Sequence, residues 1–476
     1  MTPAGTESDP LRVAIIGSGP AAFYVAERLF KLREDGVTVD MFERLPAPFG
    51  LVRYGVAPDH QKIKQVSRVF ARLADRPGFR YFGNVAYGAD LTLADIRSHF
   101  HQVCFATGAQ TDRRLGIPGE DLPRSHPATA FVAWYNGHPD FRNLEFDLSV
   151  ERVAVVGVGN VAVDVARILC RTPEELARTD IADYALEALR HSRVREVVML
   201  GRRGPAQAAF SNPEIRELGQ LTDTDTVVLP EEIELDPLSR EAVAKADGDV
   251  ARKLEILGGL AHPPAADKSR RLTIRFLVSP VELRGSATDG VQGMRLVHNR
   301  LERGAGRLKA VATERHEDLE VDMVFRSVGY RGMPLPDVPF NDAWGVIPNE
   351  HGRVTDPDGV VQQGLYVSGW IKRGPSGVIG TNKPDGKETA EAMVEDAAAG
   401  RTFDPSQAGP EAVAALVNER RPDYLSWADW QRADAIEVKR GEAAGRPRIK
   451  FTDPQEMVAQ ARGAGLEPER STGSIS

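Results

Sequence analysis

The stretch VAIIGSGPAA at residues 13–22 decides the fold of the first part of the chain. Four apolar residues, typical of a buried strand, lead into a glycine turn, and a proline that favours the start of a helix follows. In this G-x-G-x-x-G/A pattern Gly17 permits the tight turn, and Gly19 leaves room for a pyrophosphate to approach the backbone. The small side chain of Ala22 lets the helix pack closely on the strand. The stretch therefore predicts a strand, a phosphate-binding loop and a helix.

The residues after this loop indicate which nucleotide it holds. The pattern predicts a helix over residues 20–33 and a second strand over residues 37–42. Glu43 follows that strand, where a carboxylate can accept hydrogen bonds from ribose hydroxyls, so FAD or NAD is favoured. A glycine turn without a ligand is the alternative. The agreement of strand, loop, helix, strand and acid favours the nucleotide site.

A second loop, GVGNVA at residues 157–162, repeats the fingerprint with Gly157 and Gly159 in the two glycine positions. A strand is predicted before it over residues 152–156, a helix after it over 161–170, and the next strand over 196–200. That strand runs into Arg202 and Arg203 instead of an acid. Because guanidinium groups match phosphate geometry, the pair predicts a 2′-phosphate site for NADP(H). Solvated turn residues are the plainer alternative.

The rest of the chain continues the alternation of strands and helices, which indicates parallel sheets with helices on both faces. Further strands are predicted at residues 103–107, 272–278, 293–297, 321–327 and 365–367, and a helix at 387–399. We interpret residues 171–194 as a helical insertion, 236–268 as a charged surface insertion and 466–476 as a disordered tail. The predicted fold class is α/β with two Rossmann-like domains.

Composition excludes several classes of protein. The 476 residues carry a net charge of −8, which gives no support to a nucleic-acid partner. The two cysteines, Cys104 and Cys170, form no Cys-x-x-Cys pair, which argues against a thiolate metal site, an iron–sulfur cluster or a redox dithiol. We find no targeting signal and no run of the roughly 20 apolar residues that a membrane span requires. A soluble, cytoplasmic protein is therefore expected.

Several motifs together resemble the adrenodoxin-reductase-like branch of the ferredoxin–NADP(+) reductases. They are residues 15–22, PFGLVRYGVAPDH at 48–60, residues 157–169, GRRGP at 201–205 and GWIKRGPSGVIGTN at 369–382. The segments APDH and GPSGVI are far more specific than glycine loops. The resemblance implies a discontinuous FAD domain, residues 1–111 and 331–476 with a C-terminal extension, into which an NADP domain of residues 112–330 is inserted.

The resemblance also implies an activity and its site residues. NADPH would reduce FAD, which would pass electrons to a ferredoxin-type iron–sulfur protein, with cytochrome P450 enzymes as one candidate destination. The implied FAD contacts are Ala22, Glu43, Leu51, Val85, Trp370, Gly377, Val378 and Ile379. The implied NADPH contacts are Gly159, Asn160, Val161, Ala162, Arg202, Arg203 and Glu214, with Gly377 touching the nicotinamide end.

Three residues are candidates beside the reacting rings, His60, Asp164 and Glu214. A histidine ordinarily titrates near neutral pH, so His60 can stabilise charge or relay a proton. Glu214 is expected to contact the nicotinamide amide, as the resemblance implies. The plainer alternatives are a hydrogen-bonding histidine at a helix start, and acids favoured by helix dipoles.

Two other functions remain open at this point. An electron-input flavoprotein similar to a glutamate synthase small subunit would carry a cysteine-rich cluster module, which this sequence lacks. A non-catalytic NADP(H)-binding module would need no flavin segment such as the one around Trp370. Because ferredoxins are acidic, basic residues should serve docking, and Arg28, Lys31 and Arg216 are candidates.

Overall fold

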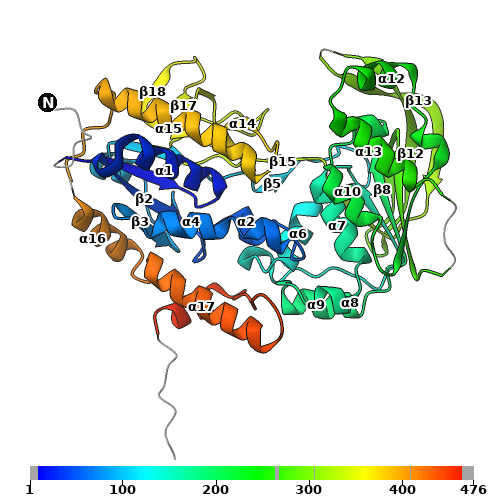
Figure 1. The fold of residues 1–476 in the computed structure, drawn as a ribbon, viewed down its shortest axis with the longest axis horizontal. Coiled ribbons are helices and arrows are strands. Elements are labelled where there is room, and N and C mark those ends of the chain that lie inside the picture. Colours follow the sequence, from blue (N-terminus) through cyan, green and yellow to red (C-terminus); the bar gives the residue numbers. More distant parts are fainter. Residues whose placement is uncertain (1–8, 263–266, 305, 408, 464–476) are drawn as a thin grey trace, which may run out of the picture. The chain divides into compact units, whose positions relative to one another are not determined.

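The computed structural model describes residues 9–262, 267–304, 306–407 and 409–463, so the predicted tail lies outside the described residues. The chain divides into two compact units. Unit 1 comprises residues 1–56, 60–111 and 330–476, and unit 2 comprises residues 57–59 and 112–329. The colours of Figure 1 follow this division, because blue and yellow to red segments build unit 1 while cyan and green segments build unit 2.

Unit 1 is built on a seven-stranded sheet with the order β16-β17-β18-β4-β1-β2-β3. Its strands are β1 (Leu11–Ile16), β2 (Val37–Glu43), β3 (Phe79–Gly83), β4 (Gln102–Phe105), β16 (Asn349–Glu350), β17 (Arg353–Thr355) and β18 (Val361–Val367). Strand β1 pairs in parallel with β2 on one side and β4 on the other. The chain therefore reverses its winding direction beside β1, and the loop after this strand lies where doubly wound folds bind ligands.

Helices cover this sheet. They are α1 (Pro20–Arg33), α2 (Leu51–Tyr54), α3 (Gln61–Lys64), α4 (Ser67–Ala74), α5 (Leu93–His99), α14 (Trp370–Arg373) and α15 (Asn382–Ala398). Figure 1 shows α1 and α15 side by side, and they pack closely because a Cβ on Gly386 would lie 2.9 Å from the Cβ of Tyr24. Phe23 of α1 stacks on Phe70 of α4 at 4.7 Å, in the apolar core of the unit.

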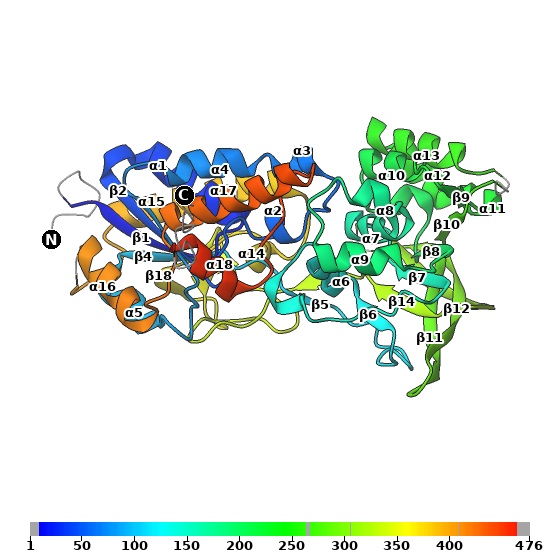
Figure 2. The same ribbon diagram turned by 90° about the horizontal axis from the view of Figure 1, so that it is seen from below.

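Three helices end the described chain and complete unit 1, α16 (Pro410–Arg420), α17 (Trp427–Ala443) and α18 (Pro454–Ala461). Figure 2 shows α17 running along α2. Arg53 of α2 donates to both carboxylate oxygens of Glu437 at 2.8 and 2.5 Å, and both side chains are buried. Arg448 lies 3.1 Å from the same carboxylate. Burial alone would raise the pKa of Glu437, but Arg53 and Arg448 lower it below its usual value.

Unit 2 contains a second, six-stranded sheet with the order β6-β14-β7-β8-β10-β9 and a three-stranded antiparallel sheet, β11-β12-β13. The strands are β6 (Ser125–Pro127), β7 (Arg152–Val156), β8 (Glu196–Gly201), β9 (Thr224–Val228), β10 (Arg270–Phe276), β11 (Val278–Ser286), β12 (Gly290–Arg303), β13 (Leu308–Leu319) and β14 (Met323–Arg326). The central strand β7 pairs in parallel with β8 and β14, which repeats the arrangement around β1.

The helices of unit 2 are α6 (Ala128–Tyr135), α7 (Asn160–Cys170), α8 (Pro173–Leu176), α9 (Asp183–Arg190), α10 (Asn212–Leu218), α11 (Pro230–Ile233), α12 (Pro237–Ala244) and α13 (Gly248–Gly259). Two short strands, β5 (Thr111–Asp112) and β15 (Tyr330–Arg331), lie where the chain crosses between the units. Among the helices that the structure describes, none is both long and apolar enough to cross a membrane.

The predicted α/β class is confirmed, and both large sheets are mainly parallel, with β16, β17 and β18 pairing antiparallel at one edge of the first. Some elements differ from the sequence-based expectations. The strand expected at residues 293–297 is the middle of the longer β12, and the helix expected from residue 387 begins at Asn382. Helices α8 and α9 occupy the predicted helical insertion. The predicted surface insertion folds into α12 and α13, and α13 buries Leu257 in the core of unit 2.

Replacing Glu437 by Gln should lower the free energy of unfolding by about 3–5 kcal/mol at pH 7, because it leaves Arg53 buried without its counter-ion. The pKa of Glu437 is lowered in the fold, so the contribution is present at neutral pH and is lost as the pH falls through that pKa. Urea unfolding should therefore show a smaller difference from the parent at pH 3 than at pH 7.

The matched control is Glu456→Gln, which removes an exposed carboxylate 3.2 Å from Arg440. It should cost less than about 1 kcal/mol. Equal losses for the two variants would contradict a special contribution from the buried pair.

Candidate functional site

The first glycine loop has the geometry that its sequence requires. Gly17 donates its backbone N–H to the carbonyl of Phe42 at 2.8 Å and has a φ of +101°. A Cβ at this position would lie 2.6 Å from the carbonyl oxygen of Ala106, so only glycine fits. A Cβ on Gly19 would meet no atom within 4 Å. One side of the loop therefore packs on the neighbouring strand ends, while the other leaves space for a ligand.

Glu43 lies at the end of β2, as predicted, and its carboxylate binds the loop itself. It accepts hydrogen bonds from the backbone N–H of Ser18 at 3.0 Å and from the Ser18 hydroxyl at 2.7 Å. It also accepts one from the backbone of Leu45 at 3.0 Å. The acid therefore orders the loop, and its contact with a ribose stays a prediction.

Two distant segments of unit 1 approach the same loop. Phe49 donates its backbone N–H to the carbonyl of Ser18 at 3.0 Å, and a Cβ on Gly50 would lie 3.1 Å from the Cα of Gly19. From the C-terminal part, a Cβ on Gly369 would lie 2.6 Å from the Cβ of Ala21. The motif segments PFGLVR and GWIKRGPSGVIG are thus brought together around the glycine turn.

Leu51, Trp370, Gly377, Val378 and Ile379, which are predicted to contact FAD, lie on these segments, and Val85 lies outside them. Trp370 begins α14, and its indole N–H donates to the carbonyl of Ser376 at 3.2 Å. Val378 is 57% exposed and Leu51 is partly exposed, whereas Val85 is buried behind Glu43. The glycine and isoleucine beside Val378 are Gly377, with a φ of +81°, and Ile379. The exposed apolar side chains are available to a ligand, and the buried ones support the loop.

A carboxylate that the sequence analysis missed holds the C-terminal segment. Asp385 accepts a hydrogen bond from the backbone N–H of Gly369 at 2.5 Å and lies 2.9 Å from the ammonium group of Lys372. The sequence has Gly369-Trp370 where many two-nucleotide flavoproteins have Gly-Asp. Here an acid from α15 contacts the same backbone position, and no local sequence pattern signals it.

The second loop repeats the geometry of the first. Gly157 donates its N–H to the carbonyl of Leu200 at 2.9 Å, and a Cβ on it would lie 2.3 Å from the carbonyl oxygen of Ser327. Gly159 again has no atom within 4 Å of its Cβ position. Asn160, at the start of α7, accepts a hydrogen bond from the Ser211 backbone at 2.8 Å. Of the next two residues, Val161 is partly buried and Ala162 fully buried.

The arginine turn follows β8, as expected. The Arg202 carbonyl accepts a hydrogen bond from the Asn299 amide at 3.0 Å, and the Arg203 carbonyl accepts one from the Leu277 backbone at 3.1 Å. The Arg202 side chain is exposed and that of Arg203 is half-buried. Neither side chain has a carboxylate partner within the described parts of the chain. Burial, and then the charge of Arg202, lowers the pKa of Arg203.

A fully buried arginine in unit 2, Arg167 of α7, was missed by the sequence analysis. Its guanidinium lies 2.7 Å from Asp59, 2.6 Å from Asp164 and 3.0 Å from Glu214. Arg171 adds a second cation 2.7 Å from Asp59. Burial alone would lower the pKa of Arg167, but Asp164 and Asp59 raise it well above its usual value. Asp164 and Glu214, two of the three candidates beside the reacting rings, therefore pair with the same buried arginine.

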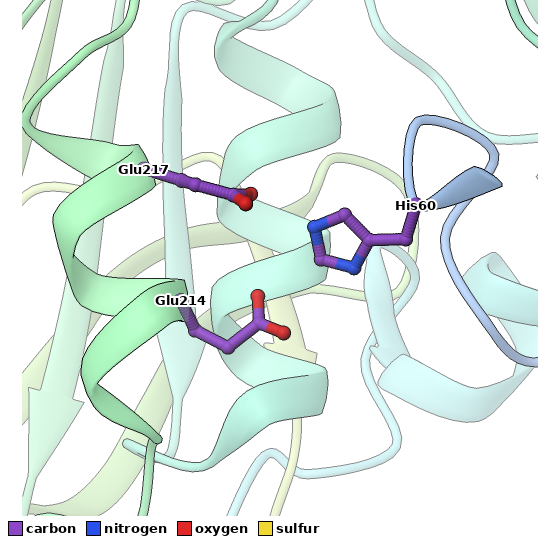
Figure 3. A group of neighbouring side chains, drawn as sticks. All are labelled: His60, Glu214 and Glu217. Atoms are coloured by element: carbon purple, nitrogen blue, oxygen red, sulfur yellow. The ribbon is translucent and has the colours of Figure 1, made fainter. Parts of the chain in front are cut away.

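The third predicted residue, His60, directly follows Asp59 in the chain. Its carbonyl accepts the backbone N–H of Ile63 at the start of α3. Figure 3 shows His60 on the segment leading into α3, and Glu214 and Glu217 one turn apart on α10. The pairing with Arg167 gives Asp164 and Glu214 a structural function, and a chemical one stays a prediction for all three residues.

The basic docking candidates differ in their surroundings. Arg28 lies 2.5 Å from Glu391, and Lys31 is paired with Glu27, so acids already compensate both charges. Arg216 on α10 is exposed and has no acidic partner among the residues that the structure describes. Of the three, only Arg216 keeps an uncompensated charge for an acidic partner.

Several known proteins are similar to this chain over most of its length. Residues 11–200 match the family described as pyridine nucleotide-disulphide oxidoreductase. The chain is 46% identical over 480 residues to the "Probable ferredoxin/ferredoxin--NADP reductase" of Mycobacterium tuberculosis, covering 99% of this chain and 79% of that relative. It is 41% identical to the human "NADPH:adrenodoxin oxidoreductase, mitochondrial", covering 95% of this chain and 92% of the relative.

A solved structure gives a similar result. "Mycobacterium tuberculosis FprA in complex with NADPH" matches with a TM-score of 0.89 and 43% sequence identity, covering 95% of this chain and 100% of that one.

Two glycine substitutions in the second loop should differ in their effect on stability. Gly157→Ala places a Cβ 2.3 Å from a backbone oxygen at a φ of +140°, so it should lower the free energy of unfolding. We expect at least about 1–3 kcal/mol from backbone strain alone. Gly159 has extended backbone with a φ of −109°, so Gly159→Ala should change the free energy by less than about 0.5 kcal/mol.

Urea unfolding checks both values, and calorimetric titration with NADP+ should show weaker binding by the Gly159 variant. If Gly159→Ala binds NADP+ like the parent, the open face of this glycine is not where the pyrophosphate lies.

Proposed function

This chain belongs to the adrenodoxin-reductase-like family of ferredoxin–NADP(+) reductases, and on that premise we propose that it is an NADPH-dependent flavoprotein reductase. It passes electrons from NADPH through FAD to a ferredoxin-type iron–sulfur protein. The observation that carries this proposal is a pair of glycine loops with the same backbone geometry and opposite charges after the next strand, Glu43 in one and Arg202-Arg203 in the other.

FAD fits the first loop. The open side of Gly19 accommodates the pyrophosphate, and Glu43 is close enough to the loop to receive a ribose hydroxyl as well as Ser18. Leu51 and Val85 would contact FAD, and Trp370 and the segment Gly377-Val378-Ile379 would hold the flavin ring and its phosphate side. When bound, FAD supplies the capacity to take up two electrons together and to release them one at a time.

NADPH fits the second loop. Its pyrophosphate lies beside Gly159 and the start of α7, formed by Asn160, Val161 and Ala162, where backbone N–H groups and the helix dipole favour an anion. Arg202 and Arg203 bind the 2′-phosphate, which explains two guanidinium groups without acidic partners in an acidic chain. A polar contact from Glu214 holds the nicotinamide amide.

His60 and Asp164 act beside the reacting rings. Arg167 positions Asp164, Glu214 and Asp59, because its buried guanidinium pairs with all three carboxylates and attracts each of them in its charged form. The backbone next to His60 is thereby anchored through Asp59.

The units correspond, in this proposal, to the domains expected from the sequence. Unit 1 holds FAD and unit 2 holds NADPH, close to the expected boundaries at residues 111 and 330. A cytoplasmic location agrees with two cysteines that are buried free thiols. Cytochrome P450 enzymes are one class of protein that the reduced iron–sulfur partner could supply.

Purified protein should be yellow and release FAD on denaturation. NADPH should bleach the flavin absorbance in the absence of oxygen, and at least one member of a panel of ferredoxins should be reduced under turnover. Protein that is colourless and stays so after FAD is added would instead favour a non-catalytic NADP(H)-binding module. If NADPH reduces the flavin but no ferredoxin is reduced, only electron transfer from NADPH to FAD would be supported.

The double variant Arg202→Ala/Arg203→Ala should raise the KM for NADPH by about 100-fold, since each charged hydrogen bond to a phosphate contributes roughly a factor of ten. The KM for NADH should stay nearly unchanged, because that coenzyme has no 2′-phosphate. Steady-state kinetics with ferricyanide as acceptor measures both. Arg190→Ala, which removes an exposed arginine paired with Glu187, is the control. Equal losses with NADPH and NADH would rule out the 2′-phosphate assignment.

A further inference from the structure

The hairpin β12–β13 carries an arginine that neither the glycine fingerprint nor the arginine turn includes. Arg303, the last residue of β12, pairs with Leu308, the first residue of β13. Between them the backbone N–H of Gly304 donates to the carbonyl of Arg307 at 3.0 Å. Arg307 therefore lies at the end of a hydrogen-bonded hairpin turn, and its side chain is exposed.

This hairpin runs beside the arginine turn in unit 2. The side-chain amide of Asn299 in β12 donates to the Arg202 carbonyl at 3.0 Å. Two residues farther along the same strand, Leu301 lies 3.8 Å from the Cβ position of Gly204, which directly follows Arg203. Figure 1 shows α12 close to β12 and β13, and Arg303 of the hairpin pairs with Glu241 of this helix. The distal end of the hairpin is thus held near the turn.

Some arginines of the hairpin are paired with acids and others are not. Arg300 lies 2.7 Å from Glu302, and Arg303 lies 2.5 Å from Glu241, so these two hairpin arginines are neutralised. Arg307 has no acidic partner within the described residues, and neither do Arg202 and Arg203. The pKa of Arg203 is lowered mainly by burial, then by the charge of Arg202, and then by the charge of Arg307. Arg307 therefore interacts electrostatically with Arg203. Three mutually repelling cations without an acid form a site suited to an anion.

We propose that Arg307 determines coenzyme specificity, as the third guanidinium group around the 2′-phosphate of NADPH. The inference rests on the proposed function of the arginine turn. Arg202 and Arg203 follow a strand of the nucleotide-binding fold itself, whereas Arg307 comes from the antiparallel hairpin added to that fold. Preference for NADPH over NADH would then depend on the hairpin as well as on the strand.

The test compares two probes that differ in the 2′-phosphate, adenosine 2′,5′-bisphosphate and adenosine 5′-monophosphate, in calorimetric titrations of the full-length flavoprotein. Arg307→Ala should weaken binding of the bisphosphate by about tenfold, the usual effect of one charged hydrogen bond, and leave the monophosphate unchanged. The KM for NADPH should rise by a similar factor at constant kcat. Arg307→Lys should recover part of the loss, because it restores charge without the planar fork.

Arg300→Ala is the matched control, because it removes the same charge from the same hairpin at a residue paired with Glu302. It should change both affinities less than twofold. An Arg307→Ala variant that behaves like this control, or that weakens both nucleotides equally, would overturn the inference. If the Arg202→Ala/Arg203→Ala variant also binds the bisphosphate normally, the proposed 2′-phosphate site itself is wrong. A loss confined to that double variant would refute only the contribution of Arg307.

Discussion

The geometry of unit 2 depends on the buried guanidinium of Arg167. A charge with no exposure to water must be surrounded by opposite charges, and the fold supplies Asp59, Asp164 and Glu214 within 3.0 Å. These acids come from the segment APDH, from the helix after the second glycine loop and from α10. Because one guanidinium pairs with all three carboxylates, the interaction holds three remote segments in one arrangement. The residues expected beside the coenzyme are therefore positioned before any ligand binds.

Unit 1 also contains a buried arginine that is paired with an acid. Arg53 follows the predicted flavin contact Leu51 by two residues and is buried against Glu437 of α17. Ion pairs of this kind add little net stability over apolar packing, but breaking one is costly, so they select one packing among alternatives. The C-terminal helices are thereby connected to the loop that surrounds the first glycine turn. In each unit a specific motif, PFGLVR or APDH, is tied to remote parts of the chain by a buried arginine.

The sequence predicted well those features that depend on neighbours in the chain. Both glycine loops, their flanking strands and helices, and the charges at Glu43 and Arg202 follow from local spacing and residue type. Arg167 could not be identified in this way, because an Asp164–Arg167 pair three residues apart on a helix looks like an ordinary surface pair. Its burial results from α10 and the segment around Asp59, which are remote in the sequence. Asp385 was missed for the same reason, since its contact with Gly369 forms only when α15 packs beside β18.

The two glycine loops have similar backbone geometry, although they are proposed to bind different nucleotides. Gly17 and Gly157 make equivalent hydrogen bonds, so the turns themselves cannot distinguish FAD from NADPH. Selection must come from the charges beside each turn. Glu43, held against the first loop by Ser18, would repel the 2′-phosphate of NADPH, whereas the uncompensated arginines at the second loop attract it. A nucleotide without that phosphate leaves those arginines repelling one another. If the proposed assignment holds, each site thus disfavours the nucleotide of the other, and the charges beside the turns, not the turns themselves, keep FAD and NADPH apart.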